Sequence, residues 1–206
     1  MTDTNEIIKK IQVSGIRRFD EAISDIPDII KLTVGEPDLP TPEHIKKAGI
    51  QAIQHDFSHY SPLMGFQKLQ VAASRYFNQK YGLTYAPSEI IATVGATEAV
   101  ATALLTILNP GDGVLLPTPS YTSYAPVVAM AHANLVPIDT TQSGYKLTPA
   151  KLAATIQAHT GQHLKAIILN YPTNPTGVTY SKAELMALVT VIRQAGLIVI
   201  SDEIYS

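Results

Sequence analysis

The sequence predicts an α/β fold built on a mostly parallel sheet. Short runs rich in β-branched residues alternate with longer stretches in which apolar residues recur with helical period. That alternation is typical of βα units, in which each helix returns the chain to begin a neighbouring parallel strand. The composition fits a globular protein with a real core, because 46% of the 206 residues are hydrophobic and 16% are charged.

Five short apolar segments are predicted as buried strands. They are too short for buried helices, and turn residues follow most of them. Their ranges are 90–94, 114–117, 134–138, 165–169 and 197–201.

Six helices are predicted before and between these strands. Ser181 and Glu184 have the spacing of a capping box, in which each side chain satisfies a free backbone donor of the other residue. Thr41-Pro42-Glu43 is also typical of a helix start, and the proline and glycines of 109–113 end a helix. The predicted helices are 43–54, 66–80, 97–108, 121–131, 148–158 and 181–195.

Charge and rare residue types argue against several functional classes. The formal net charge is −2 and the lysines are scattered, so the basic stripe of a nucleic-acid binder is missing. The chain has no cysteine, and its six histidines lack ligand spacing, so we expect no metal site. Apolar runs fall short of the roughly 20 residues that span a bilayer, and no secretory signal opens the chain. We expect a cytoplasmic protein, no membrane contact and a small-molecule partner.

Four loops follow predicted strands and carry polar or special residues, and that edge of an open α/β sheet is where ligands bind. Gly95-Ala96-Thr97 leads into a helix, whose free N–H groups favour a phosphate, although simple capping by Thr97 is an alternative. After the next strand, Tyr121 and Tyr124 lie three apart. Tyr121 can stack on a flat ring, although ordinary packing explains the pair as well.

The last two of these loops add an amide and a carboxylate. In the loop 170–177, Asn174 can donate a hydrogen bond to a ligand oxygen, although an ordinary turn has the same composition. Asp202 follows an apolar strand, so its carboxylate needs a cationic partner such as a protonated pyridine nitrogen. Capping of a following helix by Asp202 is the alternative. The convergence of the four loops favours a ligand site.

These motifs resemble the aspartate aminotransferase family, the class I and II aminotransferases of fold type I. The similarity covers essentially the whole chain, through residues 32–38, residues 60–65, the four loops and the final Ser201-Asp202-Glu203-Ile204-Tyr205, in family order. The segment 14–19 and the Gly35 loop are similar to bacterial aromatic-type and broad-specificity members.

The resemblance implies an incomplete pyridoxal 5'-phosphate (PLP) transferase large domain in a three-layer α/β/α arrangement. Residues 1–45 would form an N-terminal arm and the start of a small domain, and residues 46–206 the incomplete large domain. Gly95, Ala96 and Thr97 would bind the cofactor phosphate. Tyr60 would reach the phosphate of a partner subunit's cofactor, which implies a homodimer.

The remaining roles that the resemblance implies concern the cofactor ring and the substrate. Tyr121 would stack on the pyridine ring, and Asp202 would pair with its nitrogen. Asn174 and Tyr205 would hydrogen-bond the ring hydroxyl oxygen. Gly35 would lie where the substrate carboxylate binds, and the substrates would be an amino acid and a 2-oxo acid.

The family's Schiff-base lysine follows the aspartate and would lie beyond Ser206, so no catalytic residue is assigned to this chain. We therefore expect the chain alone to be inactive in transamination, and poorly stable unless another chain associates with it. Two alternatives stay open. One is a non-enzymatic remnant of a broken gene, and the other is part of a PLP-dependent carbon–sulfur β-lyase.

Overall fold

The computed structural model describes residues 4–11, 15–33 and 35–205, which divide into two compact units. One unit combines Met1–Gln12 with Val94–Ser206, and the other is Val13–Thr93. Ser14 and Val34, which belong to two of the family-like motifs, lie outside the described residues. The proposed boundary between residues 45 and 46 stays a prediction.

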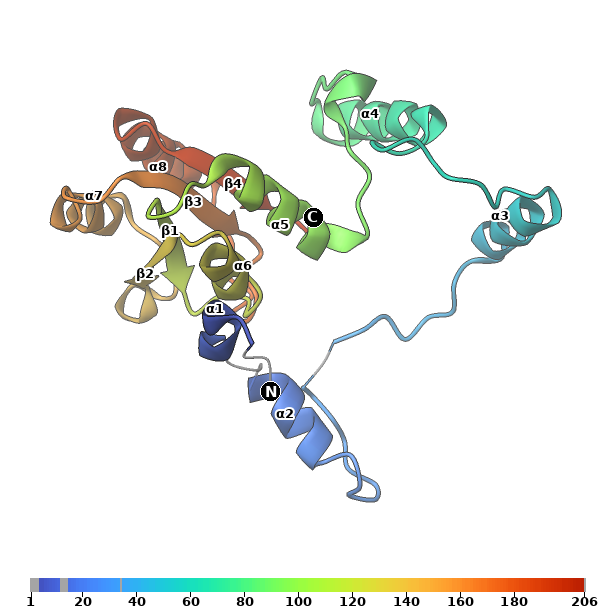
Figure 1. The fold of residues 1–206 in the computed structure, drawn as a ribbon, viewed down its shortest axis with the longest axis horizontal. Coiled ribbons are helices and arrows are strands. Elements are labelled where there is room, and N and C mark those ends of the chain that lie inside the picture. Colours follow the sequence, from blue (N-terminus) through green and yellow to red (C-terminus); the bar gives the residue numbers. More distant parts are fainter. Residues whose placement is uncertain (1–3, 12–14, 34, 206) are drawn as a thin grey trace. The chain divides into compact units, whose positions relative to one another are not determined.

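The unit that contains Val94–Ser206 is built on a four-stranded sheet in which every pairing is parallel (Figure 1). Its strand order is β2-β1-β3-β4. The strands are β1 (Gly113–Thr118), β2 (Asn134–Asp139), β3 (Leu164–Asn170) and β4 (Ile198–Asp202). Four predicted strands and the mostly parallel sheet are therefore confirmed.

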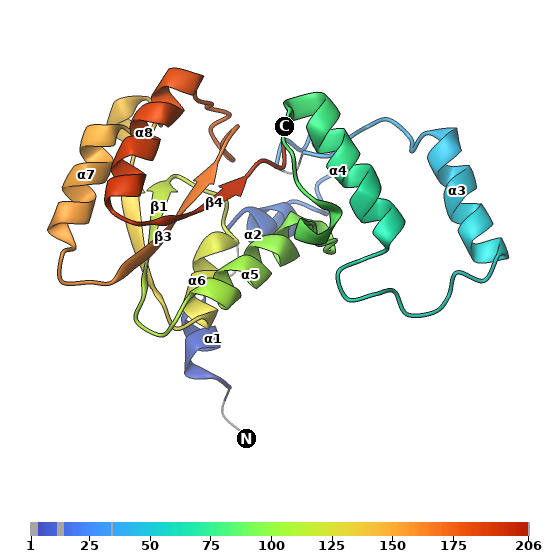
Figure 2. The same cartoon turned by 90° about the horizontal axis from the view of Figure 1, so that it is seen from above.

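Helices cover both faces of this sheet, with α5 and α6 on one face and α7 and α8 on the other (Figure 2). Their bounds are α5 (Gly95–Ile107), α6 (Tyr124–Met130), α7 (Pro149–Ala158) and α8 (Lys182–Gln194). This arrangement confirms the three layers. The unit also contains the short helices α1 (Glu6–Lys10) and η2 (Thr141–Ser143).

Helix α6 begins later than predicted. Its first residue is Tyr124 rather than residue 121, because residues 119–123 form the bend and turn by which the chain leaves β1. The start of α8 follows the prediction. Ser181 N donates to Glu184 Oε2 at 2.7 Å and Glu184 N donates to Ser181 Oγ at 3.3 Å, which completes the predicted capping box.

Two buried clusters fill the two faces of the sheet. Val114 and Leu115 are adjacent in β1 but belong to different clusters, because successive strand residues point to opposite faces. Leu104 of α5 is buried in the first cluster, and Leu188 of α8 in the second. The apolar strand runs in the sequence thus reflect burial on both sides.

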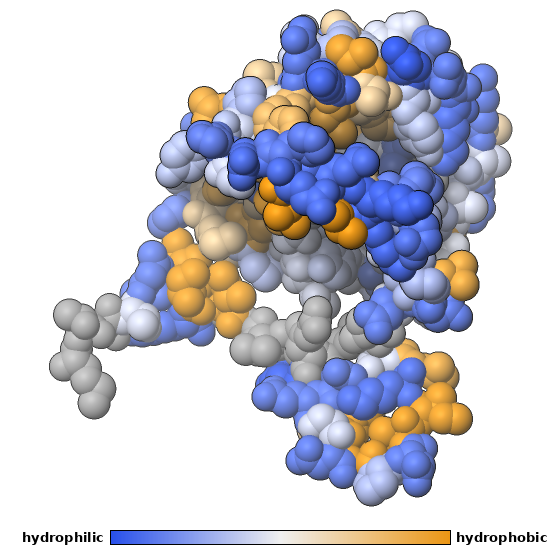
Figure 3. Space-filling model, turned by 90° about the vertical axis from the view of Figure 1, so that its right-hand side faces the viewer, coloured by the Kyte–Doolittle hydropathy of each residue, from blue (hydrophilic) through white to orange (hydrophobic). Residues whose placement is uncertain are grey.

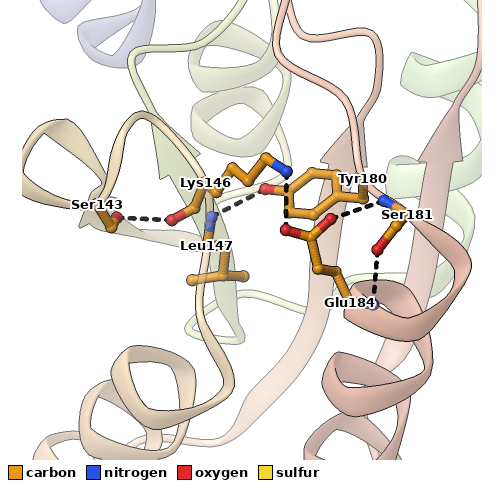
Figure 4. Close-up of polar contacts among 6 residues, drawn as sticks. All are labelled: Ser143, Lys146, Leu147, Tyr180, Ser181 and Glu184. Carbon is orange, nitrogen blue, oxygen red and sulfur yellow. Dashed lines mark hydrogen bonds and ion pairs between the residues drawn. The ribbon is translucent and has the colours of Figure 1, made fainter.

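A polar clasp joins the segment after β2 to the start of α8 (Figure 4). Lys146 Nζ lies 2.7 Å from Glu184 Oε1. Leu147 N donates to the phenolic oxygen of Tyr180 at 2.9 Å. The Lys146 ammonium, together with the donors of Ser181, lowers the pKa of Glu184 to about 2.

We expect this clasp to contribute to stability in a pH-dependent way. Because the folded-state pKa of Glu184 lies below the ordinary value of 4.5, the contribution is present above that value and is lost as the pH falls towards about 2. The effect is small, since the side chain is 42% exposed. Urea unfolding of Glu184→Gln and of Lys146→Gln should show a shallower loss of stability in this acid window. An unaltered acid slope in both variants would contradict the prediction.

The unit Val13–Thr93 is helical, and among its described residues no strand is formed. Its helices are α2 (Gly15–Ala22), α3 (Glu43–Gln54), α4 (Gln67–Tyr81) and the short η1 (Pro87–Glu89). The predicted helices 43–54 and 66–80 are confirmed. No residue of α3 or α4 is buried, and Figure 3 shows apolar side chains, in orange, exposed among hydrophilic ones. No helix in the described ranges is both long and apolar enough to cross a membrane.

The predicted strand at 90–94 is wrong. Ala92 N donates to Met64 O at 3.0 Å, and the carbonyl of Ile90 accepts from Gln70 Nε2 at 2.7 Å. Backbone groups of the segment are therefore bonded to a loop and to a side chain of α4. A strand needs a neighbour that exchanges backbone hydrogen bonds with it, and within the described residues no strand lies along this segment.

Candidate functional site

A cavity of about 210 Å³ lies at the C-terminal edge of the parallel sheet. The start of α5 and the segments that follow β1, β3 and β4 contribute to its lining. Six residues predicted to bind a cofactor line this one cavity: Ala96, Thr97, Tyr121, Asn174, Asp202 and Tyr205. Parallel strands present their carboxyl ends at one edge, which is why distant parts of the sequence meet here.

The start of α5 forms one wall of the cavity. Gly95 has a φ of +80°, a left-handed conformation that suits glycine, and it begins the helix directly before Ala96 and Thr97. The N-cap residue is Val94, whose apolar side chain offers no hydrogen bond to the first-turn amides. Thr97 lies inside the helix, so it is not the N-cap. First-turn amides of this kind favour an anion.

The two tyrosines after β1 differ in their surroundings. Both line the cavity, but Tyr121 is 37% exposed whereas Tyr124 is 2% exposed. Their ring centroids lie 5.7 Å apart with the planes at 80°, an edge-to-face contact. Tyr124 is therefore the packing residue of the pair, and Tyr121 keeps ring surface available for stacking.

Asp202 ends β4 with its side chain at the cavity and is 9% exposed. The hydroxyl of Tyr124 donates to Oδ2 at 2.7 Å, and Ile204 N donates to Oδ1 at 3.2 Å. Burial and, to a smaller extent, the neighbouring Asp202 raise the pKa of Tyr124. The phenol therefore stays protonated and acts as the donor. In the part of the chain that the structure describes, no Lys, Arg or His side chain forms an ion pair with Asp202.

Asn170, the last residue of β3, and Asn174, in the loop that follows it, are bonded to the same region. Asn174 Nδ2 donates to the Tyr205 hydroxyl oxygen at 3.1 Å, so these two predicted partners of one ligand oxygen lie side by side. Asn170 connects them to Asp202. Its Oδ1 accepts from Asn174 N at 2.8 Å, and its Nδ2 donates to the backbone oxygen of Asp202 at 3.0 Å.

Gly35 and Tyr60 belong to the unit Val13–Thr93 and are not among the residues that line the cavity. Tyr60 is fully exposed, and a Cβ added to Gly35 would meet nothing within 4 Å. Their roles stay predictions. Among the described residues, no group of three or more His, Cys, Asp or Glu side chains could hold a metal ion.

The sequence is similar to known aminotransferases. The family model of aminotransferase class I and II matches residues 27–206. The chain is 40% identical over 203 residues to the Bacillus subtilis (strain 168) protein named "Probable N-acetyl-LL-diaminopimelate aminotransferase", covering 98% of this chain and 51% of that protein. It is 39% identical over 179 residues to an aspartate aminotransferase of Geobacillus stearothermophilus, covering 86% and 44%.

The fold is also similar to solved structures of aminotransferases. Aspartate aminotransferase from Thermus thermophilus, crystallised with maleate, has a TM-score of 0.91 at 31% identity and covers 100% of this chain and 54% of its own. N-Succinyldiaminopimelate aminotransferase from Mycobacterium tuberculosis has a TM-score of 0.89 at 32% identity, covering 98% and 52%. The chain spans about half the length of these relatives. By sequence and by fold, it belongs to the class I and II aminotransferase family.

Proposed function

We propose that this chain is the N-terminal part of a PLP-dependent aminotransferase, which transfers an amino group between an amino acid and a 2-oxo acid. The observation that carries the proposal is the carboxylate of Asp202, which is nearly buried in a cavity and has no cationic partner in the described residues. A buried carboxylate is costly unless a cation compensates it. A protonated pyridine nitrogen is such a cation.

The other walls of the cavity suit the rest of PLP. The first turn of α5 offers amides to a phosphate, and Tyr121 offers ring surface to a flat heterocycle. The Asn174 and Tyr205 pair offers hydrogen bonds to a ring hydroxyl oxygen. The donor set thus fits a phosphorylated hydroxypyridine.

When bound, PLP supplies an electron sink for the electrons released as a bond to the amino-acid α-carbon breaks. In this proposal, Asp202 keeps the ring nitrogen protonated, which preserves that capacity. Tyr121 covers one ring face and excludes water from it. Asn174 and Tyr205 fix the orientation of the ring in its plane.

Several finer features belong to the same proposal. Tyr60 would contact the cofactor of a second subunit in a homodimer, and Gly35 would lie at the substrate carboxylate. Residues 46–206 would form the large domain of a cytoplasmic enzyme, after the arm and small-domain segment 1–45. The matched relatives are named for two different substrates, aspartate and N-acetyl-LL-diaminopimelate. The substrates proposed for this chain's enzyme are therefore an amino acid and a 2-oxo acid, without a particular amino acid.

The test compares PLP with pyridoxal, which has the same ring without the phosphate, by equilibrium dialysis against the 206-residue chain. We expect PLP to bind about five- to thirtyfold more tightly, because a helix N-terminus adds roughly 1–2 kcal/mol for an anion. Absence of PLP binding would overturn the proposal. Equal affinity for the two compounds would mean that the first-turn amides of α5 do not bind the phosphate.

A further inference from the structure

The contact between Tyr124 and Asp202 joins two distant parts of the sequence. The residues are 78 positions apart, and the Tyr124 hydroxyl donates to Asp202 Oδ2 at 2.7 Å. Both side chains are nearly buried, at 2% and 9% exposure. A hydrogen bond to an ionised carboxylate is stronger than one between neutral groups, particularly away from water.

The backbone position of Asp202 does not by itself fix the orientation of its carboxylate. The terminal torsion of an aspartate side chain is broad, so the plane of the carboxylate is set by its hydrogen bonds. The bond from Ile204 N to Oδ1 is longer, at 3.2 Å, and comes from the turn that follows β4. The bond from Tyr124 is shorter and comes from a different layer of the fold.

Tyr124 is a well-fixed donor. It is the first residue of α6 and belongs to the buried cluster that also contains Leu104 and Ile168. The edge-to-face contact with Tyr121 restrains its ring further. Its hydroxyl is therefore held at the cavity by the packing of the core.

We propose that Tyr124 is a positioning residue, whose hydroxyl orients the Asp202 carboxylate toward the ring nitrogen of PLP in the cavity. This inference rests on the proposed function and extends it to a residue outside the predicted set. Because Tyr124 acts through Asp202 in this inference, the effect of its hydroxyl on ligand binding should depend on the presence of the ring nitrogen.

The test measures the binding of two ligands to Tyr124→Phe, which removes the hydroxyl and keeps the ring. One ligand is PLP, and the other is 1-deazapyridoxal 5'-phosphate, in which carbon replaces the ring nitrogen. We expect the dissociation constant of PLP to rise about tenfold and that of the deaza analogue to stay within about twofold. Tyr145→Phe is the matched control. It removes the same atom from a residue that is 44% exposed and outside the cavity lining, so both constants should stay unchanged.

Each alternative outcome is distinct. An equal loss for both ligands would overturn the inference, because Tyr124 would then shape the cavity as a whole. Unaltered PLP affinity would overturn it as well. Failure of the unaltered chain to bind PLP would instead refute the proposed function on which the inference rests.

The same substitution in a chain that already carries Asp202→Asn distinguishes a specific effect of Tyr124→Phe from a general loss of stability. In Asp202→Asn no buried charge is left without its donor, so adding Tyr124→Phe there should change PLP affinity less than about twofold. A tenfold loss in that background would show that Tyr124 acts independently of Asp202.

Discussion

Replacement of Asp202 by asparagine is expected to weaken PLP binding by about a hundredfold or more. Removing one partner of a buried ion pair costs roughly 3–5 kcal/mol, because the other charge is left without compensation. A loss of that size exceeds a hundredfold in a dissociation constant. Asparagine has nearly the same shape and retains an oxygen that can accept from Tyr124, so the cavity itself should persist. Equilibrium dialysis with PLP, alongside a thermal melt, measures both properties.

Asp139→Asn is the control for this substitution. Asp139 ends β2 at the same edge of the same sheet, is exposed, and accepts a hydrogen bond from Thr141 N at 2.9 Å. It lies outside the cavity lining, so the same change of charge should leave PLP affinity unaltered. If the two variants bind PLP equally well, Asp202 does not pair with the cofactor.

The sheet could be predicted because its signal is local. The segments that became β1 and β3 are apolar almost throughout, and Ser181 and Glu184 mark the start of α8 in the sequence itself. The convergence of the three loops after β1, β3 and β4 could also be predicted, since the carboxyl ends of parallel strands share one edge. The start of α5 meets them there although, among the described residues, no strand precedes it. These inferences use only neighbours in sequence and the geometry of βα units.

The strand predicted at 90–94 was wrong because strand formation is not a local property. Ile90 and Ile91 have the composition of a buried strand. Residues 90–94 nevertheless have no partner strand among the described residues, and Ala92 N is bonded to Met64 O instead. Apolar periodicity indicates that a segment can be buried, but it does not identify the segment that pairs with it.

Tyr124 and Asn170 were missing from the predicted site for a related reason. Each interacts with Asp202 across a long stretch of chain, and each was weighed only within its own loop. Tyr124 carries a weak signal, since it follows Tyr121 by three residues and the structure buries one ring and leaves the other at the cavity. Residues that orient a functional group are found through its hydrogen bonds, which the sequence does not display.

Leu104→Ala is expected to destabilise the sheet-containing unit by roughly 2–5 kcal/mol, the range for truncating a buried leucine to alanine. Leu104 is completely buried between α5 and the sheet, in the cluster that includes Val114 and Ile168. Removal of its side chain leaves a cavity that the surrounding strands fill only in part. Urea unfolding followed by far-UV circular dichroism measures the loss.

Leu105→Ala provides the comparison, because it removes the same atoms from the next residue of the same helix. Leu105 is 51% exposed, so its truncation should change the free energy of unfolding by only about 0.5 kcal/mol. The helix propensity term is the same for both substitutions, so the difference between them isolates burial. Since α5 also carries Ala96 and Thr97 at its start, Leu104→Ala should weaken PLP binding together with stability, whereas Leu105→Ala should leave PLP binding unchanged. Equal destabilisation by the two variants would mean that α5 does not pack on the sheet through Leu104.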